Sequence, residues 1–328
     1  MFLLRRKTSL KPLTQIPFFS SFPNFSTSSA ITYDEPTAAS YDDLIASAAN
    51  SNDLTTVRRL LNKRNKDGLF NTAKTFKFVT DTYLNTNLDD LIQTLSNLDK
   101  GFTRKNAFDC LIIHLCKSKK IEESLTLINT MIAKGISVNA VTFHPLLSVL
   151  GKQSLDQWRV INVMMENKID IDITAYNYLL TACCYQGDLT GAARVLEMVL
   201  EKGMKADTRT YDALIMGACK VGKVEAGLVL LRKMEEERIP AMYCTHTHVI
   251  KSLVGLGCFS QAVEFVMIFV GRDKQLDESN FGFLLNSLVR KKRVEEAKLI
   301  FEEMEKRGLG MGDKLQSEYK ILLASQAN

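Results

Sequence analysis

Cysteine and histidine are the side chains of this sequence that would most readily ligate a metal or act as nucleophiles. The chain has seven cysteines and four histidines. No two cysteines form a Cys-x-x-Cys pair, and the odd count argues against a disulfide framework or a structural zinc site. His246 and His248 are two residues apart, so on a helix they would point to different faces. The pattern predicts free cysteines that pack as small apolar side chains, with no metal site and no cofactor.

The sequence contains no glycine-rich phosphate loop, no nucleophile elbow and no His-Glu-x-x-His motif. It also lacks any apolar stretch approaching the ~18 residues that a membrane helix requires. We therefore expect a binding protein rather than an enzyme, with no small-molecule substrate and no membrane span.

Residues 1–30 differ in composition from the rest of the chain. They contain the basic residues Arg5, Arg6, Lys7 and Lys11, many serines and phenylalanines, and no acidic residue. This composition is typical of a cleavable organelle-targeting peptide, and a disordered tail is the alternative. The early arginine pair favours the mitochondrion, with the chloroplast as the other possible destination. Residues 31–37 are expected to be a linker.

The charge of the chain depends on this leader. The whole chain carries a formal charge of +5, and residues 1–30 contribute four basic side chains, so the remainder is only about +1. A protein held to nucleic acid mainly through phosphate charge is usually far more basic.

An internal repeat is the main feature of the sequence after the leader. Residues 173–207 align without a gap on residues 208–242, which gives a period of 35 residues. An aromatic residue or histidine recurs at the fourth position of every repeat: Tyr41, Phe76, Phe108, Phe143, Tyr176, Tyr211, His246, Phe281 and Tyr319. The chain is therefore expected to be an array of similar units.

Each unit is expected to form two helices. The first half has apolar residues at helical spacing, such as Tyr176, Leu179 and Cys183, and a glycine turn follows. A small residue recurs early in the second half, where it would let the two helices approach closely: Ser124, Ala192, Gly227, Ala262 and Ala297. Because one hairpin cannot bury its apolar stripes alone, neighbouring hairpins must stack.

These residues resemble the pentatricopeptide repeat family, of the P class found in plant organelles. The resemblance rests on TAYNYLL at 174–180, Cys-Lys at 116–117 and 219–220, and AKLIFEEMEKRG at 297–308. The tetratricopeptide repeat is the main alternative family for this period, but its W-x₂-L-G-x₂-Y pattern is absent. The resemblance implies an all-α, right-handed superhelical solenoid of about eight helix-turn-helix repeats. Eight repeats fill residues 38–315, and residues 316–328 would be a truncated repeat or cap. The expected repeats are 38–72, 73–104, 105–139, 140–172, 173–207, 208–242, 243–277 and 278–315.

The resemblance also implies a function. Similar proteins bind single-stranded RNA in mitochondria and chloroplasts and act in RNA processing, splicing, stabilisation or translation. Their first helices line a concave surface on which each repeat reads one base. The alternative is a structural or adaptor protein, such as a subunit associated with the mitochondrial ribosome or another ribonucleoprotein, which would use the solenoid for protein contacts.

Base-reading residues follow from the resemblance. In the family, the fifth residue and the last residue of each repeat choose the base. Asn177 with Asp207 is similar to a uridine reader, and Thr247 with Asp277 is similar to a guanine reader. The six other pairs depart from the family's well-understood combinations: Asp42 with Thr72, Lys77 with Arg104, Asp109 with Asn139, His144 with Asp172, Asp212 with Met242, and Gly282 with Leu315.

A basic column occupies the thirteenth position of four repeats, as Lys117, Lys152, Lys220 and Arg290. In the family this position lies near the RNA phosphates, and a cationic row with one member per repeat suits a nucleic-acid backbone. The alternative is a set of solvated helix ends, where the helix dipole favours lysine and arginine.

Overall fold

The computed structural model describes residues 37–271 and 273–324, apart from the side chains of Asn85 and Thr86. The predicted leader (1–30) and all but the last residue of the predicted linker (31–37) lie outside the described residues. In the described part, every regular element is a helix, so the all-α prediction is confirmed. The elements are α1 (Ala38–Asn50), α2 (Leu54–Lys66), η1 (Ala73–Phe76), α3 (Asp81–Ser96), α4 (Phe102–Lys117), α5 (Ile121–Ala133), α6 (Ala140–Leu150), α7 (Ser154–Glu166), α8 (Ile173–Gln186), α9 (Leu189–Glu201), α10 (Thr208–Lys220), α11 (Val224–Glu236), α12 (Tyr243–Gly255), α13 (Phe259–Phe269), α14 (Lys274–Arg290), α15 (Val294–Lys306) and α16 (Asp313–Ala324).

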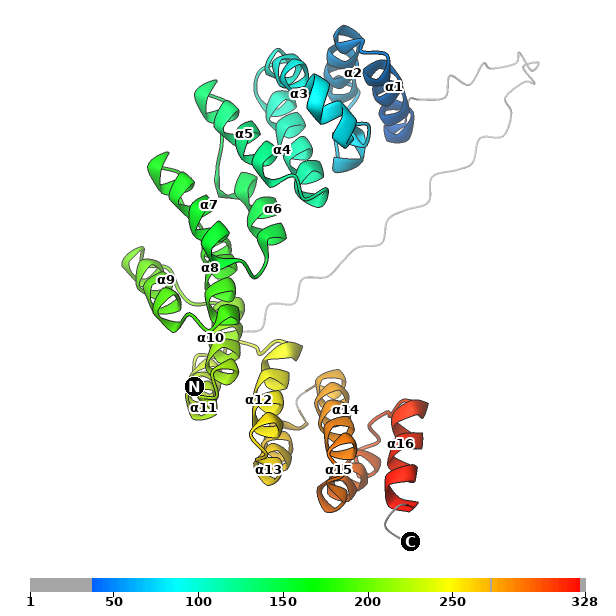
Figure 1. The fold of residues 1–328 in the computed structure, drawn as a ribbon, viewed down its shortest axis with the longest axis vertical. Helices are drawn as coiled ribbons and strands as arrows, with labels where there is room; N and C mark the ends of the chain where they lie inside the picture. The colour runs from blue at the N-terminus through cyan, green and yellow to red at the C-terminus, as the bar shows by residue number, and fades with distance from the viewer. Residues whose placement is uncertain (1–36, 272, 325–328) are drawn as a thin grey trace, which may run out of the picture. The chain divides into compact units, whose positions relative to one another are not determined.

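The helices form hairpins that stack one on the next along the chain (Figure 1). Within a hairpin, α8 packs on α9, α10 on α11 and α12 on α13. Between hairpins the first helices touch directly, because α8 packs on α10, α10 on α12, and α12 on α14. The first helices therefore make one continuous layer, and the predicted solenoid of stacked helical hairpins is confirmed.

The segment 73–104 differs from the two-helix pattern that the sequence predicts. Its first helix is only the four-residue 3₁₀ turn η1, and α3 begins soon after, at Asp81. Thr72 caps η1 and Thr80 caps α3, each through its side-chain hydroxyl, so two start signals lie eight residues apart. Phe76 is nevertheless fully buried, which keeps the aromatic column continuous through this segment.

The aromatic column forms the core of the repeats. Phe108, Phe143 and Phe281 are fully buried, and Tyr211 is 3% exposed. The Tyr211 hydroxyl donates a hydrogen bond of 2.7 Å to Glu237, the C-cap residue that follows α11 of the same hairpin. Burial, together with this carboxylate, raises the pKa of Tyr211 to about 12. The column therefore joins the two helices of its own repeat.

Small residues allow the helices to approach closely, as the sequence predicts. A Cβ added at Gly227 in α11 would lie 3.1 Å from the Cys219 Sγ of α10. A Cβ at Gly217 in α10 would lie only 2.8 Å from the Cβ of Cys184 in α8. The first contact lies within a hairpin and the second joins neighbouring hairpins, so both kinds of packing depend on a missing side chain.

Candidate nucleic-acid interface

The last residue of a repeat caps the first helix of the next repeat in the middle of the array. Asp172 precedes α8 and accepts a hydrogen bond of 2.9 Å from the backbone N–H of Ala175. Asp207 precedes α10 and accepts one of 2.9 Å from the backbone N–H of Thr210. Aspartate is favoured at such N-caps because its carboxylate satisfies backbone donors that lack a partner within the helix.

The structure brings Asn177 and Asp207 together. The Asn177 amide donates to an Asp207 carboxylate oxygen over 2.9 Å, and its own oxygen accepts from the Thr210 hydroxyl over 2.8 Å. Since an amide offers two N–H donors and two acceptor lone pairs, one of each remains after these two bonds. In the preceding repeat His144 and Asp172 also meet, with Nε2 3.0 Å from the carboxylate.

A threonine near the start of a first helix supports the fifth residue of the preceding repeat. This hydroxyl donates a hydrogen bond across the junction in three places: Thr142 to Asp109 over 3.3 Å, Thr210 to Asn177 over 2.8 Å, and Thr245 to Asp212 over 2.7 Å. The sequence interpretation missed this role. The recurrence of threonine at the third position of the repeat is the signal that would have revealed it.

Thr247 and Asp277 are arranged differently from Asn177 and Asp207. Helix α14 begins at Lys274 and is capped by Asp273, so Asp277 lies one turn inside the helix. Asp277 is 5% exposed and accepts a hydrogen bond of 2.8 Å from the backbone N–H of Gly271. Thr247 donates to the carbonyl of Tyr243 in its own helix, over 3.3 Å. Asp277 therefore does not occupy the N-cap position that Asp207 has, and guanine reading by this pair stays a prediction.

Two acidic residues at the fifth position of other repeats are engaged in ion pairs. Asp42 pairs with Arg64, whose side chain is 1% exposed. Asp109 pairs with Lys105, 2.8 Å away and one turn earlier on α4. Asp42 thus partners a buried cation and Asp109 a partly exposed one, so both carboxylates are engaged within the protein.

The basic column lies at the carboxyl ends of the first helices. Lys117, Lys220 and Arg290 are the last residues of α4, α10 and α14, and Lys152 follows α6 in the turn. All four side chains are exposed. The structure thus puts the four predicted backbone contacts at equivalent places in four repeats.

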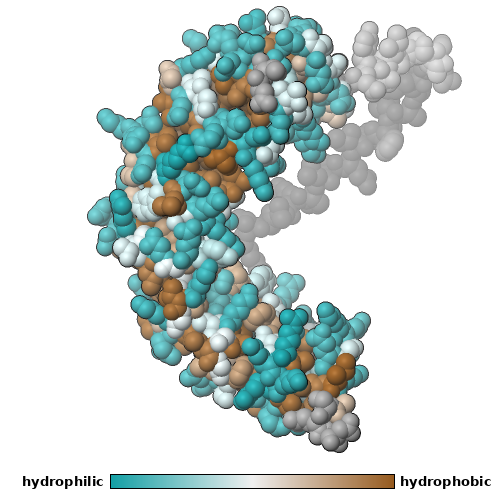
Figure 2. Space-filling model, viewed as in Figure 1, coloured by the Kyte–Doolittle hydropathy of each residue, from teal (hydrophilic) through white to brown (hydrophobic). Residues whose placement is uncertain are grey.

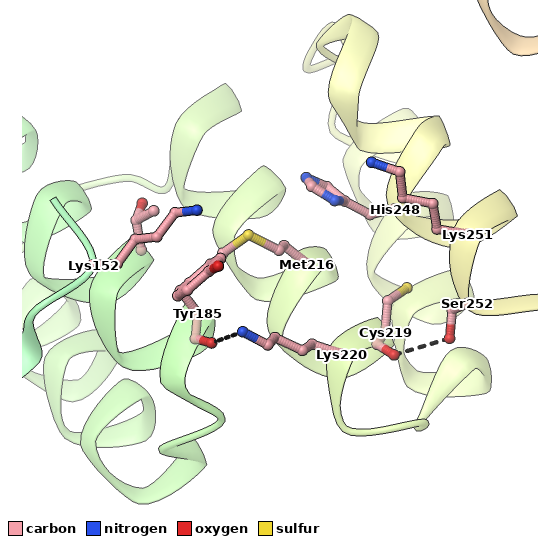
Figure 3. A pocket seen from close by; sticks show the side chains of 9 residues that line it. Lys152, Tyr185, Met216, Cys219, Lys220, His248, Lys251 and Ser252 are labelled. Atoms are coloured by element: carbon pink, nitrogen blue, oxygen red, sulfur yellow. Dashed lines mark hydrogen bonds between the residues drawn. The ribbon is translucent and has the colours of Figure 1, made fainter. Parts of the chain in front are cut away.

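Tyr185 takes the place of a lysine in this column and organises two of its members. The Lys152 and Lys220 ammonium nitrogens lie 3.7 Å and 3.5 Å from the centre of the Tyr185 ring (Figure 3). Lys220 also donates a hydrogen bond to the Tyr185 carbonyl. A hydrogen bond with Lys152, and then the charges of both lysines, lower the pKa of Tyr185 below its usual value.

These residues line a groove of about 550 Å³ that runs from the turn after α6 to α12 (Figure 3). Lys251 and His248 of α12 face the same groove. Ammonium groups beside an aromatic ring suit a phosphodiester backbone with stacked bases. The sequence interpretation missed Tyr185 and Lys251, because neither fits the basic column at the thirteenth position.

Known protein families match much of the chain. A family described as "Pentatricopeptide repeat-containing protein" matches residues 81–197, and "PPR repeat" descriptions match residues 202–235 and 280–309. Among the described residues, no helix has both the length and the apolar character needed to cross a bilayer.

Two solved structures of the pentatricopeptide repeat protein PPR10 are similar in fold. PPR10 in complex with an 18-nt RNA element is 18% identical, with a TM-score of 0.49 over 86% of this chain and 40% of that one. PPR10 from maize is 12% identical, with a TM-score of 0.46 over 89% of this chain and 47% of that one. The chain thus spans less than half the length of PPR10.

Two mitochondrial pentatricopeptide repeat-containing proteins of Arabidopsis thaliana are closer in sequence. One is 44% identical over 286 residues, which cover 85% of this chain and 82% of the relative. The other is 43% identical over 283 residues, which cover 85% and 81%. These relatives confirm the predicted mitochondrial localisation. Their identity and coverage show that the chain belongs to the pentatricopeptide repeat family.

Proposed function

We propose that this protein binds single-stranded RNA in mitochondria and holds the strand for RNA processing, splicing, stabilisation or translation. It acts as a binding protein, and its chemistry is recognition rather than catalysis. Family membership supports this proposal, because helical-repeat proteins of this kind assign one base to each repeat and read it with two or three side chains.

Asn177 and Asp207 are the main base-reading pair in this proposal. Uridine offers one N–H donor between two carbonyl acceptors on its pairing edge. The remaining N–H of Asn177 suits a uridine carbonyl, and the Asp207 carboxylate suits the uridine N–H. Cytosine has an acceptor where uridine has its N–H, so it would face the carboxylate unfavourably.

Thr247 and Asp277 are the second proposed pair and would select guanine. Asp277 lies within α14 rather than at its N-cap, so this pair lacks the N-cap arrangement that joins Asn177 to Asp207. We therefore assign most of the base selectivity to the fifth repeat.

Lys117, Lys152, Lys220 and Arg290 are proposed to contact phosphates. Such contacts position the strand but carry no base identity. The observation that carries the proposal is the hydrogen-bonded pair of Asn177 and Asp207, in the repeat whose α8 also bears Tyr185. Lys152 and Lys220 of the two neighbouring repeats pack against that ring.

The test is a change of specificity. Asn177→Thr beside Asp207 creates the combination that resembles the family's guanine reader. Selection from a randomised RNA pool should enrich uridine at one position with the unchanged protein and guanine at that position with the variant. One good base contact contributes about 1–3 kcal/mol to the binding free energy. Asn167→Thr, at the end of α7, is the matched control and should leave the selected sequence unchanged.

Two results would contradict the proposal. If the unchanged protein enriches no RNA, the binding function is wrong. If Asn177→Thr selects the same sequence as the unchanged protein, the pair does not read a base. Because the expected outcome is a new preference rather than a loss, a folding defect cannot imitate it.

A second candidate function is a protein scaffold, which a different surface favours. Five successive second helices, from α7 to α15, each carry a large apolar side chain that is 54–83% exposed. These residues are Leu155, Leu200, Val229, Ile268 and Leu299. Figure 2 shows hydrophobic patches among the hydrophilic side chains of one face. Co-sedimentation with mitochondrial ribosomes that survives ribonuclease and is lost on Leu155→Ser and Leu200→Ser would favour this role.

A further inference from the structure

Three side chains with different metal-ligating atoms meet where α10 and α12 pack together. Asp212 lies on α10, and Cys244 and His248 lie on α12. Their carboxylate oxygen, thiol sulfur and imidazole nitrogen all lie within 4.8 Å of one another. We propose that these three residues bind one Zn²⁺ ion, a role independent of RNA binding.

The spacing on α12 suits chelation. Cys244 and His248 are four residues apart, so they lie on the same face of the helix on consecutive turns. Asp212 comes from the neighbouring repeat, 32 positions before Cys244. A bound ion would therefore join two first helices that already pack together, and it would strengthen the junction between the sixth and seventh repeats.

The distances between the ligand atoms approach those of a tetrahedral zinc site. The Asp212 Oδ1 atom lies 3.3 Å from Cys244 Sγ and 3.7 Å from His248 Nε2. Zinc takes oxygen and nitrogen ligands at about 2.0–2.2 Å and sulfur at about 2.3 Å, so tetrahedral ligands stand roughly 3.3–3.6 Å apart. All three ligand atoms lie within 4.8 Å of one another, so the side chains would draw closer together around a bound ion.

The surroundings favour an ion at this place. The side chains of Asp212 and His248 are 17% and 21% exposed, so the carboxylate and imidazole are largely shielded from water. The Thr245 hydroxyl donates to Asp212 Oδ1 over 2.7 Å and orients the carboxylate, as outer partners of metal ligands commonly do. Carboxylate, thiolate and neutral imidazole together balance the two positive charges of zinc.

Binding replaces one proton with the metal. The Cys244 Sγ–H bond breaks, the sulfur–zinc bond forms, and the proton leaves to solvent. Three protein ligands leave the fourth coordination position for a water molecule. His248 also lines the groove that contains Tyr185 and the lysines, so the ion would lie beside that groove.

Zinc titration of the untagged full-length chain against a chromophoric chelator tests the site. We expect one tightly held Zn²⁺ per chain. Cys244→Ser and His248→Gln should each weaken binding at least tenfold, since even outer partners of metal ligands are worth 10–100-fold in affinity. Cys258→Ser is the matched control, because Cys258 is also a half-buried free cysteine, and it should bind zinc normally. Unchanged zinc affinity in Cys244→Ser overturns the proposal.

A second measurement uses only the unchanged protein, so misfolding of a variant cannot obscure the outcome. Co²⁺ in place of Zn²⁺ should show a thiolate-to-cobalt charge-transfer absorption. Added Zn²⁺ should protect Cys244 from alkylation, detected by mass spectrometry of its peptide, and leave Cys258 as reactive as before. Absence of the absorption band together with equal alkylation of the two cysteines would mean that Asp212 and Cys244 form only a hydrogen bond.

Discussion

Replacing Lys152 and Lys220 together by alanine should make RNA binding less dependent on salt. Both ammonium groups lie within 4 Å of the centre of the Tyr185 ring, at 3.7 Å and 3.5 Å, and both are exposed. Neither lysine forms an ion pair with an acidic residue of the described chain. Their charges are therefore available to phosphates.

The size of the effect follows from counterion release. On single strands, each neutralised phosphate adds about 0.7 to the slope of log affinity against log salt concentration. Loss of two contacts should lower the slope by about 1.4. Between 50 mM and 200 mM salt, a fourfold change, the unchanged protein should lose about sevenfold more affinity than the double variant.

The measurement is the dissociation constant for one single-stranded RNA across that salt range. Lys202→Ala is the control, because Lys202 is exposed at the end of α9, a second helix. It should leave the slope unchanged. Equal slopes for the double variant and the unchanged protein would refute phosphate contact. A decrease of about 0.7 in the slope of Lys202→Ala, half that of the double variant, would show that only total charge matters. The preference for uridine should persist in the double variant, since phosphates carry no base identity.

Two predictions concern the stability of the array, and urea unfolding measures both. Gly217→Ala should destabilise the protein by about 1–2 kcal/mol, because the new Cβ would lie 2.8 Å from the Cβ of Cys184. At Gly282 a new Cβ would meet no atom within 4 Å, so Gly282→Ala should be neutral or stabilising. Equal changes in stability for the two substitutions would show that helix propensity, and not contact with Cys184, determines the effect. Asp42→Ala should lower the free energy of unfolding by about 3 kcal/mol, because it leaves the guanidinium of Arg64, which is 1% exposed, without its carboxylate partner. A decrease of less than about 1 kcal/mol would contradict a structural role for this ion pair.

Much of the fold could be predicted from the sequence because each repeat has the same packing requirement, a large buried side chain in the first helix and a small one in the second. The aromatic column and the small residues of the second helices recur at a period near 35, and both are buried where the helices of a hairpin meet. The exception, η1, was not predicted, because the Phe76 column position is kept while threonine caps interrupt the helix around it. A periodic pattern therefore predicts which residues are buried more accurately than it predicts the residue at which a helix begins.

Contact between the fifth residue and the last residue of a repeat could be predicted from the sequence only where the repeat keeps its register. Asn177 and Asp207 meet because Asp207 caps α10, whereas Asp277, which repeat counting puts in the same column, lies inside α14. The shift follows from the early start of α14 at Lys274, which counting residues cannot reveal. The cluster of Asp212 and Cys244 was missed for another reason, since its members lie on different helices and each looks ordinary alone.

Under the proposed function, the residues at the fifth position of the repeat suggest how a repeat array with little net charge would hold RNA at a defined place. In the first, third and sixth repeats the fifth residue is an aspartate: Asp42 binds Arg64, Asp109 binds Lys105, and Asp212 accepts from Thr245. Such side chains join neighbouring elements and leave less capacity for a base. In the fourth and fifth repeats the fifth residue instead meets the aspartate that caps the next helix, and the two lysines on Tyr185 lie at the ends of helices in this same region. Recognition would then be concentrated in a few central repeats, with the outer ones serving mainly to extend and stabilise the array.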